Sequence, residues 1–387
     1  MRRFSADYIY TLDGAAIENG IVVTDDNGKI LAVTDEKALL DPNIERFEGI
    51  IVPGFVNTHC HLELSHLHKK ITKGKGLIPF VKEVISKRGE KEEVVIEAMK
   101  KADEEMLNNG IVAVGDISNK TISAEIKNSS KIKYHTFLEM LAFDSSKSSE
   151  AIENAVNLKQ AFKTPTSITP HAPYSLSKEL LKDLAKYCKR GDNKISIHNQ
   201  ENDEENNLYR YKEGPFMDFF KDLKIDTDRF KAQSKNSIQT MIPFLPDNQN
   251  ILLVHNTYTS LKDIYFTKRF NRKLHWCFCP NSNLYIENRF PTFEFFKYTN
   301  YPITLGTDSL ASNQKLCILT EMKLIQKNFE DVSFEELLKW ATINGAKFLG
   351  FQNELGSIVN GKTPGLNLIT NIKYGRLTEK SAVRKLI

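Results

Sequence analysis

Short apolar runs separated by turns fill the first fifty residues. The runs at 6–12, 21–24 and 30–33 are rich in β-branched and aromatic side chains, and Asp26-Asn27-Gly28 lies between the last two. Because aspartate, asparagine and glycine favour tight turns, this stretch predicts a β-hairpin. We therefore expect an antiparallel sheet at the start of the chain.

From Ile51 onward, short apolar runs alternate with longer, charged segments that have helical spacing. The helical segments include 90–109, 149–162, 177–190 and 261–270. The predicted strands are 51–57, 111–117, 132–139, 167–171, 194–200, 251–257, 274–280 and 303–308. Apolar strands alternating with helices favour an α/β fold with a closed parallel (β/α)8 barrel, the TIM-barrel architecture. A doubly wound open sheet is the alternative.

The last part of the chain returns to β-strand character at 356–358 and 365–369. We expect these strands to join those at the start in a small β-sandwich domain formed by both termini. The predicted domains are therefore a composite β domain, residues 1–50 plus 350–387, and a catalytic barrel, residues 51–349.

Composition narrows the class of protein. The chain has 387 residues, of which 41% are hydrophobic and 26% are charged, as in an ordinary globular protein. A net charge of +4 and the absence of a basic stripe argue against a nucleic-acid partner.

Five cysteines, an odd number, suit a reducing compartment, and we expect Cys277 and Cys279 to be buried thiols. No apolar run of about 18 residues predicts a membrane span, and Met1-Arg2-Arg3-Phe4 is not followed by the apolar run of a signal peptide. The expected location is cytoplasmic.

Histidines gather at the ends of the predicted strands. In a barrel of this kind the active site lies at the carboxyl ends of the strands. Five of the nine histidines fall there, together with one aspartate: His59, His61, His171, His198, His255 and Asp308. Taken singly, each has a structural interpretation, such as a core histidine or, for Asp308, a helix cap.

A metal site accounts for this gathering better than separate structural roles do. Residues two apart in a strand point to the same face, so His59 and His61 can both reach one ion. Imidazoles and a carboxylate are suitable ligands for Zn²⁺, and Fe²⁺ accepts the same ligands. We therefore expect one divalent metal, with one position left for water.

Glu201 follows His198 by three residues, a spacing that places a carboxylate over the site without binding the metal. A metal lowers the pKa of bound water, and a nearby glutamate can carry the proton from that water to a leaving group. The alternative is a solvent-facing loop acid, because Asp203, Glu204 and Glu205 follow closely.

These residues resemble the amidohydrolase superfamily over nearly the whole chain. The segment from Pro53 to His61 looks like its opening metal motif, and His198-Asn199-Gln200-Glu201 is similar to the strand-five motif of the branch that deaminates aromatic amines. The segments 305–309 and 311–313 fit further signatures of that branch, which includes chlorohydrolase-like relatives. The resemblance implies one metal bound by His59, His61, His198 and Asp308, with His255 beside it. The strand-four lysine that bridges two metals in other relatives is missing.

The resemblance also suggests residues that bind the substrate. The segments 170–175 and 279–283 look like pocket segments of nucleoside-type deaminases, which implies substrate contacts for His171 and Asn283. The segment 61–65 resembles aminofutalosine deaminases, which would place Glu63 at the pocket rim, although an ordinary loop hydrogen bond explains it equally well. Arg289 can pair with a substrate carboxylate, but a surface ion pair is its default interpretation.

The function implied by the resemblance is hydrolytic deamination of an amino-substituted heteroaromatic ring, such as a 6-aminopurine nucleoside. Metal-bound hydroxide attacks the ring carbon, Glu201 protonates the ring nitrogen, Asp308 accepts the proton of the water, His255 orients the hydroxide, and ammonia leaves. Hydrolysis of an amide, a cyclic amide or a ring C–Cl bond is the alternative, and a non-catalytic barrel scaffold is a third. A homodimer is expected from base rate and resemblance.

Overall fold

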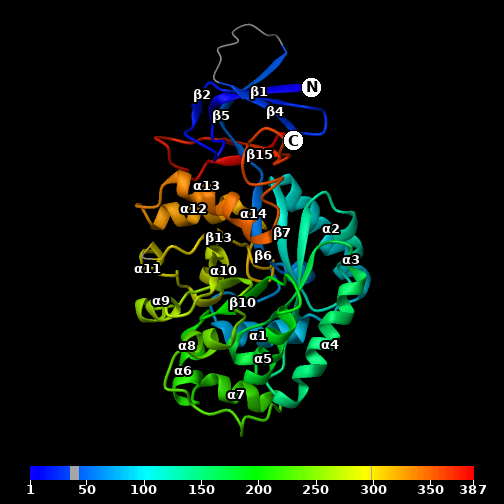
Figure 1. Cartoon of the computed structure of the whole chain (residues 1–387), viewed down its shortest axis with the longest axis vertical. Helices are drawn as coiled ribbons and strands as arrows, with labels where there is room; N and C mark the ends of the chain where they lie inside the picture. The colour runs from blue at the N-terminus through cyan, green and yellow to red at the C-terminus, as the bar shows by residue number, and fades with distance from the viewer. Residues whose placement is uncertain (35–42, 298) are drawn as a thin grey trace.

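The computed structural model describes residues 1–34, 43–297 and 299–387, and it places a small sheet at one end of a larger α/β region (Figure 1). The small sheet has the order β15-β14-β5-β1-β3-β4, with β2 paired to β1. Its strands are β1 (Arg2–Ile9), β2 (Ile17–Glu18), β3 (Ile21–Thr24), β4 (Ile30–Thr34), β5 (Ile44–Pro53), β14 (Leu366–Thr370) and β15 (Ala382–Lys385). Strands from both ends of the chain therefore share one sheet.

The two ends of the chain meet along β5, which pairs with β1 on one side and antiparallel with β14 on the other. The predicted hairpin is present, since β3 and β4 are antiparallel neighbours. The strand predicted at 356–358 is wrong: these residues form no strand, although Ile358 N donates to Thr11 O at 2.9 Å. Within the described residues these strands make a single sheet, so a second, facing sheet stays a prediction.

The predicted strand 51–57 is in fact the junction of two strands, β5 and β6 (Phe55–Cys60). The break falls at Pro53-Gly54, where Gly54 N donates to Pro364 O at 3.1 Å. A Cβ on Gly54 would lie 2.3 Å from a methyl group of Val112, so only glycine fits this close approach. The chain thus leaves the small sheet and enters the α/β region within one residue, which periodicity alone did not reveal.

The α/β region contains two four-stranded parallel sheets, in the orders β6-β7-β8-β9 and β10-β11-β12-β13. The strands after β6 are β7 (Ile111–Ser118), β8 (Lys133–Met140), β9 (Thr166–Pro170), β10 (Ile195–Asn199), β11 (Asn250–His255), β12 (Lys273–Phe278) and β13 (Ile303–Leu305). Each predicted barrel strand except the first matches one of these within a few residues.

Helices connect the strands and cover the sheets (Figure 1). They are α1 (Leu77–Lys87), α2 (Glu92–Asn108), α3 (Ala124–Ser129), α4 (Ser148–Leu158), α5 (Lys178–Cys188), α6 (Asp203–Tyr211), α7 (Pro215–Asp222), α8 (Ser237–Met241), α9 (Leu261–Thr267), α10 (Pro280–Glu287), α11 (Phe293–Lys297), α12 (Ile318–Asn328), α13 (Phe334–Ala341) and α14 (Ile343–Leu349). None of the helices in the described part of the chain is long and apolar enough to cross a membrane. All five cysteines are free and buried, as predicted for Cys277 and Cys279.

Backbone hydrogen bonds tie the two parallel sheets together at the carboxyl ends of their strands. At one seam His198 N donates to His171 O at 2.9 Å. At the other, Thr307 N and Asp308 N both donate to His59 O at 3.1 Å. The strand ends that carry the predicted site residues are therefore held side by side by the main chain.

A buried ion pair anchors the loop that follows His61. Lys127 Nζ lies 2.5 Å from Asp116 Oδ2, and both side chains are 0% exposed. The same ammonium donates to Ser118 Oγ at 2.7 Å, and Asp116 Oδ1 accepts a hydrogen bond from Leu62 N at 2.8 Å. The pair thus links α3, β7 and the turn directly after β6.

Replacing Lys127 by Met should destabilise the protein strongly, because it leaves the Asp116 carboxylate buried without a cation. Removing one partner of a buried pair typically costs about 3–5 kcal/mol. We expect a loss of this size in the free energy of unfolding, measured by urea titration. The exposed Lys131→Met variant is the control, with a change within about 0.5 kcal/mol. Equal stabilities of the two variants would contradict the interpretation.

Candidate metal centre and active site

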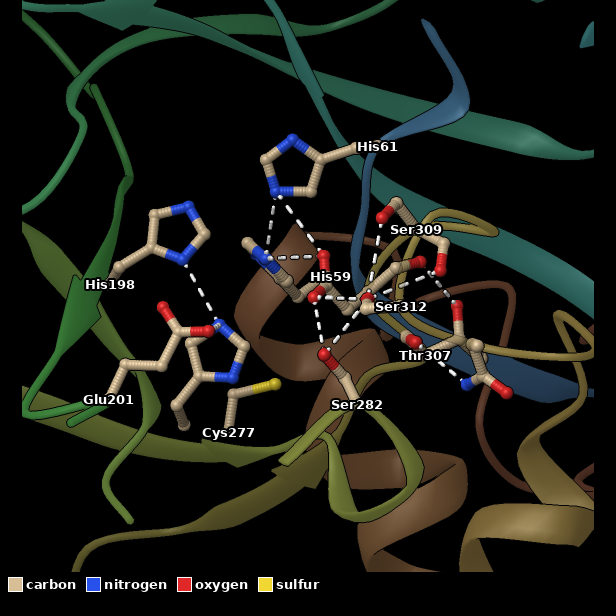
Figure 2. A network of polar contacts seen from close by, with 12 residues as sticks. His59, His61, His198, Glu201, Cys277, Ser282, Thr307, Ser309 and Ser312 are labelled. Carbon is tan, nitrogen blue, oxygen red and sulfur yellow. Dashed lines mark hydrogen bonds and ion pairs between the residues drawn. The ribbon is translucent and has the colours of Figure 1, made fainter. Parts of the chain in front are cut away.

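His59 and His61 face one another at the end of β6 (Figure 2), and Asp308, which follows β13, lies beside them. His59 lies in β6 and His61 follows that strand, and their Nε2 atoms are 3.2 Å apart. Asp308 Oδ1 lies 3.6 Å from His61 Nε2 and 4.0 Å from His59 Nε2. The structure therefore brings these three predicted ligands together.

Two serine hydroxyls fix the orientation of Asp308. Ser282 Oγ in α10 donates to Asp308 Oδ2 at 2.6 Å, and Ser312 Oγ donates to the same oxygen at 2.8 Å. Oδ1 is left to face the imidazoles. Burial opposes ionisation of this carboxyl, but the nearby His61 and His255 outweigh it, and the pKa of Asp308 is lowered from its ordinary value. The group is therefore a carboxylate at neutral pH.

A chain of hydrogen bonds sets the proton positions on two further histidines. Asn283 Oδ1 can only accept, so the 2.9 Å contact to His255 Nδ1 places a proton on that nitrogen. His255 Nε2 then accepts from His198 Nδ1 at 3.1 Å. His198 consequently keeps an unshared electron pair on Nε2, which is buried and has no hydrogen-bond partner among the described residues. This is the form of histidine that binds a metal.

The donor set fits a divalent metal ion. One ligand atom from each of His59, His61 and His198 lies within 4.8 Å of the other two. Burial lowers the pKa of His59 well below its usual value and that of His198 to about 3, so both rings are neutral. Neutral imidazoles and one carboxylate make a set that suits Zn²⁺. The orphaned Nε2 atom of His198 is explained if such an ion is bound.

Glu201 lies on the other side of His198, against His255. Its Oε1 atom is 3.7 Å from His255 Nε2, and the residue is 4% exposed. Burial, followed by the negative charges of Asp308 and Glu287, raises the pKa of Glu201 well above its ordinary value. A carboxyl group in this position can hold a proton near neutral pH and release it inside the pocket.

Comparison with known proteins shows the family of this chain. The family model described as "Amidohydrolase family" matches residues 50–383. The chain belongs to the amidohydrolase family. An adenosine deaminase of Helicobacter pylori is 26% identical over 327 residues, covering 83% of this chain and 78% of that protein.

Two solved structures share the fold. A crystal structure of Helicobacter pylori aminofutalosine deaminase with methylthio-coformycin has a TM-score of 0.82 at 23% identity, covering 98% of this chain and 94% of that one. A zinc-containing atrazine chlorohydrolase of Arthrobacter aurescens TC1 has a TM-score of 0.75 at 14% identity, covering 100% of this chain and 93% of that one.

Three of the predicted substrate residues of this amidohydrolase, His171, Asn283 and Arg289, lie in environments that differ from one another. His171 Nδ1 contacts Ser175 Oγ at 2.9 Å, and the His171 ring centre lies 5.1 Å from that of His198. Asn283 holds His255, while its Nδ2 atom is buried and has no hydrogen-bond partner in the part of the chain that the structure describes. Arg289 is exposed and lies over the ring of Tyr258, 4.6 Å from the ring centre.

Glu63 faces a neighbouring loop. Its oxygens accept hydrogen bonds from Ser123 Oγ and from Asn119 N, both at 3.2 Å. These contacts favour the structural interpretation of Glu63, namely that it holds the loop after β7.

Sequence reasoning missed Glu139, at the end of β8. Its Oε1 lies 3.6 Å from His198 Nε2, and its Oε2 accepts from Asn119 Nδ2 at 3.0 Å. Burial opposes ionisation, yet His171 and His198 keep the pKa of Glu139 far below its usual value. The signal was available, because Glu139 is the last residue of the predicted strand 132–139 and strand ends carry the site.

Several strand-end residues have a strained, left-handed backbone. The φ angles of Gln200, His255, Asn256 and Asp308 are 45°, 72°, 57° and 56°. Residues other than glycine adopt this conformation at a cost of about 1–3 kcal/mol, and such residues cluster at functional sites. The local strain therefore coincides with the predicted chemistry.

The Glu205 carboxyl group supports the backbone beside Glu201. The raised pKa of this carboxyl group can be tested through the pH dependence of stability. Glu205 Oε1 accepts from Gln200 N at 3.0 Å, and burial raises its pKa from the usual 4.5 to about 8. The folded protein therefore keeps a proton that the unfolded chain releases near pH 4.5. Stability should fall as pH rises from 4.5 to 8, by up to about 1.4 kcal/mol per pH unit from this group.

In the Glu205→Gln variant this contribution is removed. Urea unfolding of metal-free protein at pH 5, 6, 7 and 8 should show a shallower decline for the variant than for the wild type. Glu204→Gln, at the partly exposed neighbour in α6, should keep the wild-type slope. Parallel curves for Glu205→Gln and wild type would rule out the raised pKa.

Proposed function

We propose that this amidohydrolase is a metal-dependent deaminase that removes the amino group of a 6-aminopurine nucleoside-like substrate as ammonia. The observation that carries the proposal is the juxtaposition of a proton-holding carboxyl, Glu201, with neutral histidines and the Asp308 carboxylate. The proposed fold is one (β/α)8 barrel made from the two parallel sheets and flanked by the composite β domain. The cytoplasmic location and the homodimer stay predictions.

His59, His61, His198 and Asp308 are the proposed metal ligands, with Zn²⁺ favoured and Fe²⁺ the alternative. A divalent cation held there supplies Lewis acidity, which makes water a competent nucleophile at neutral pH. Asp308 is held by two serines through Oδ2, so Oδ1 faces His59 and His61 and could accept the proton of a water held there. His255, fixed by Asn283, would help to orient that water.

Glu201 is the proposed proton carrier. Its raised pKa means that it holds a proton when substrate arrives, and its place beside His255 directs that proton into the pocket. Donation to a ring nitrogen makes the adjacent carbon electrophilic. Asp308 can then pass the proton taken from water to the departing amine, and the Glu201 carboxylate can regain a proton from the new hydroxyl group as ammonia leaves. Both steps need a carboxyl group in a nearly dry site, and 4% exposure provides one.

The names of the relatives support a purine nucleoside-like substrate, because they include adenosine deaminase and aminofutalosine deaminase. His171 and the Nδ2 atom of Asn283 are the proposed substrate contacts. Arg289 stays a prediction for a substrate with a carboxylate, since its guanidinium group already packs on Tyr258.

A second candidate is hydrolysis of a ring C–Cl bond, or of an amide or cyclic amide. It is favoured by the full-length structural likeness to atrazine chlorohydrolase. The metal ligands would be the same, and the difference would lie in the leaving group, since an amine needs a proton to depart and chloride does not.

A substrate panel distinguishes the two candidates. We expect zinc-loaded protein to release ammonia from adenosine, 5′-deoxyadenosine or aminofutalosine, measured by a coupled ammonia assay. Treatment with a chelator should abolish this activity, and added Zn²⁺ should restore it. Chloride release from chlorotriazines, or amide hydrolysis without ammonia from any aminopurine, would overturn the proposal in favour of the second candidate.

Replacing Glu201 by Gln should lower kcat by about 10²-fold or more, because the amide cannot carry the proton. Metal content, measured by atomic absorption, should stay the same, since Glu201 is not a proposed ligand. Asp203→Asn, an exposed position two residues later, is the matched control and should keep wild-type turnover. Normal turnover in the Glu201→Gln variant would exclude Glu201 as the proton carrier.

A further inference from the structure

The residue before Glu201 has a strained backbone that hydrogen bonds hold in place. Gln200 is 0% exposed, and its φ angle of 45° lies in the left-handed region that residues other than glycine rarely adopt. Gln200 N donates to Glu205 Oε1 at 3.0 Å, and Gln200 O accepts from Tyr258 N at 3.0 Å. Because the two residues are adjacent, this conformation sets the direction in which the chain presents Glu201.

The side chain of Gln200 is held as firmly as its backbone. Its Oε1 atom accepts a hydrogen bond from Thr259 Oγ1 at 2.7 Å. Its Nε2 atom donates to Asn206 Oδ1 at 2.9 Å and to Asp263 Oδ2 at 3.2 Å. Since a carboxylate can only accept, the bond to Asp263 fixes which end of the amide is Nε2. The side chain therefore has one orientation.

Asp263, in α9, is a rigid anchor for this side chain. The residue is 0% exposed. Its carboxylate accepts from Asn236 Nδ2 at 3.0 and 2.7 Å, from Gln239 Nε2 at 2.7 Å and from Ser260 Oγ at 2.7 Å. A buried carboxylate that loses such donors becomes costly to keep in the interior. The group is thus confined to one position, and it offers Gln200 a fixed acceptor.

A second strained residue, Asn256, follows His255 and is bonded to the end of β10. Its φ angle is 57°, and Asn256 N donates to Asn199 O at 3.0 Å. Asn199 Nδ2 in turn donates to Asn256 Oδ1 at 3.0 Å. The ends of β10 and β11 are therefore joined directly beside Glu201 and His255, whose Oε1 and Nε2 atoms lie 3.7 Å apart.

We propose that Gln200 is a positioning residue for proton transfer: its side chain, anchored on Asp263, holds the Glu201 carboxyl group in place beside His255. This inference rests on the proposed function and deepens it, because it accounts for the aim of the proton carrier. Gln200 acts through Glu201 and is not itself a catalytic residue. A displacement of about 1 Å in a reacting group can lower turnover by about 10²-fold, so the loss of this support should be measurable.

Replacing Gln200 by Met removes the hydrogen bonds of the amide but keeps a side chain of similar length. In the zinc-loaded protein we expect kcat for adenosine to fall about 10- to 100-fold, because Glu201 loses its fixed position. KM should change less than about twofold, since the groups that bind the substrate are unaltered. Both constants are measured by a coupled ammonia assay.

Gln239→Met is the matched control. Gln239 lies in α8 and donates to the same carboxylate, but it is not adjacent to Glu201. Each variant loses one glutamine bond to Asp263, so we expect similar falls in the thermal midpoint of unfolding. Turnover should fall only in Gln200→Met. Zinc content, measured by atomic absorption, should be equal in the wild type and in both variants.

A double variant tests whether Gln200 acts through Glu201. In the Glu201→Gln background the carboxyl group is already gone, so adding Gln200→Met should lower kcat further by less than about twofold. If Gln200→Met does not fold, Thr259→Val carries the test, because it removes only the hydroxyl that donates to Gln200 Oε1. A lower kcat with unchanged KM in Thr259→Val would support the inference, and an unchanged kcat would refute it.

Three results would overturn the role of Gln200 in an active enzyme. The first is an equal loss of kcat in Gln200→Met and Gln239→Met, which would make the effect one of stability. The second is a loss of zinc in Gln200→Met, and the third is an undiminished effect of this substitution in the Glu201→Gln background. A wild type that deaminates no aminopurine would instead remove the proposed function, and the role of Gln200 with it.

Discussion

The site depends on one constraint: several hydrogen-bond acceptors, imidazole nitrogens and carboxylate oxygens, are buried close together without enough donors among them. His59, His61 and His198 present imidazole nitrogens to one small volume, and Asp308 and Glu139 add carboxylate oxygens. Within the described residues, the ion pairs of both carboxylates are with histidines, not with lysine or arginine. Such a collection of acceptors is unfavourable in a dry interior unless a cation or donor joins it. The surrounding fold supplies the stability that keeps these groups together until that partner binds.

Residues that are not proposed metal ligands set the chemistry of those that are. The amide of Asn283 fixes the proton positions on His255 and, through it, on His198. Ser282 and Ser312 choose which oxygen of Asp308 faces the histidines. Glu321 in α12 in turn accepts from Asn281 N at 3.0 Å, and so holds the start of α10 that carries Ser282 and Asn283. The reactivity of the site is therefore decided by the segments that follow β12 and β13.

The positions of the strand ends could be predicted from the sequence, but the directions in which individual side chains point could not. Parallel strands bring their carboxyl ends to one edge, so His59, His198 and Asp308 were predictable as neighbours once the strands were recognised. For Glu63 the sequence left two interpretations open, because position in a motif does not fix a side-chain rotamer; its carboxylate accepts hydrogen bonds from Asn119 and Ser123. Glu139 went unnoticed at the end of an apolar run. The break at Pro53-Gly54 was equally hidden, because periodicity continues across the junction of β5 and β6.

The pairing of β5 with β14 has a consequence for the order in which the protein is made. Roughly 300 residues separate these two strands, and at about 5–20 residues per second a ribosome needs some 15–60 s to synthesise them. During that interval one edge of β5 has no strand beside it. An unpaired strand edge is a template for pairing with other chains. Until its final segment is complete, the nascent chain therefore exposes an edge of β5 at which other chains can pair.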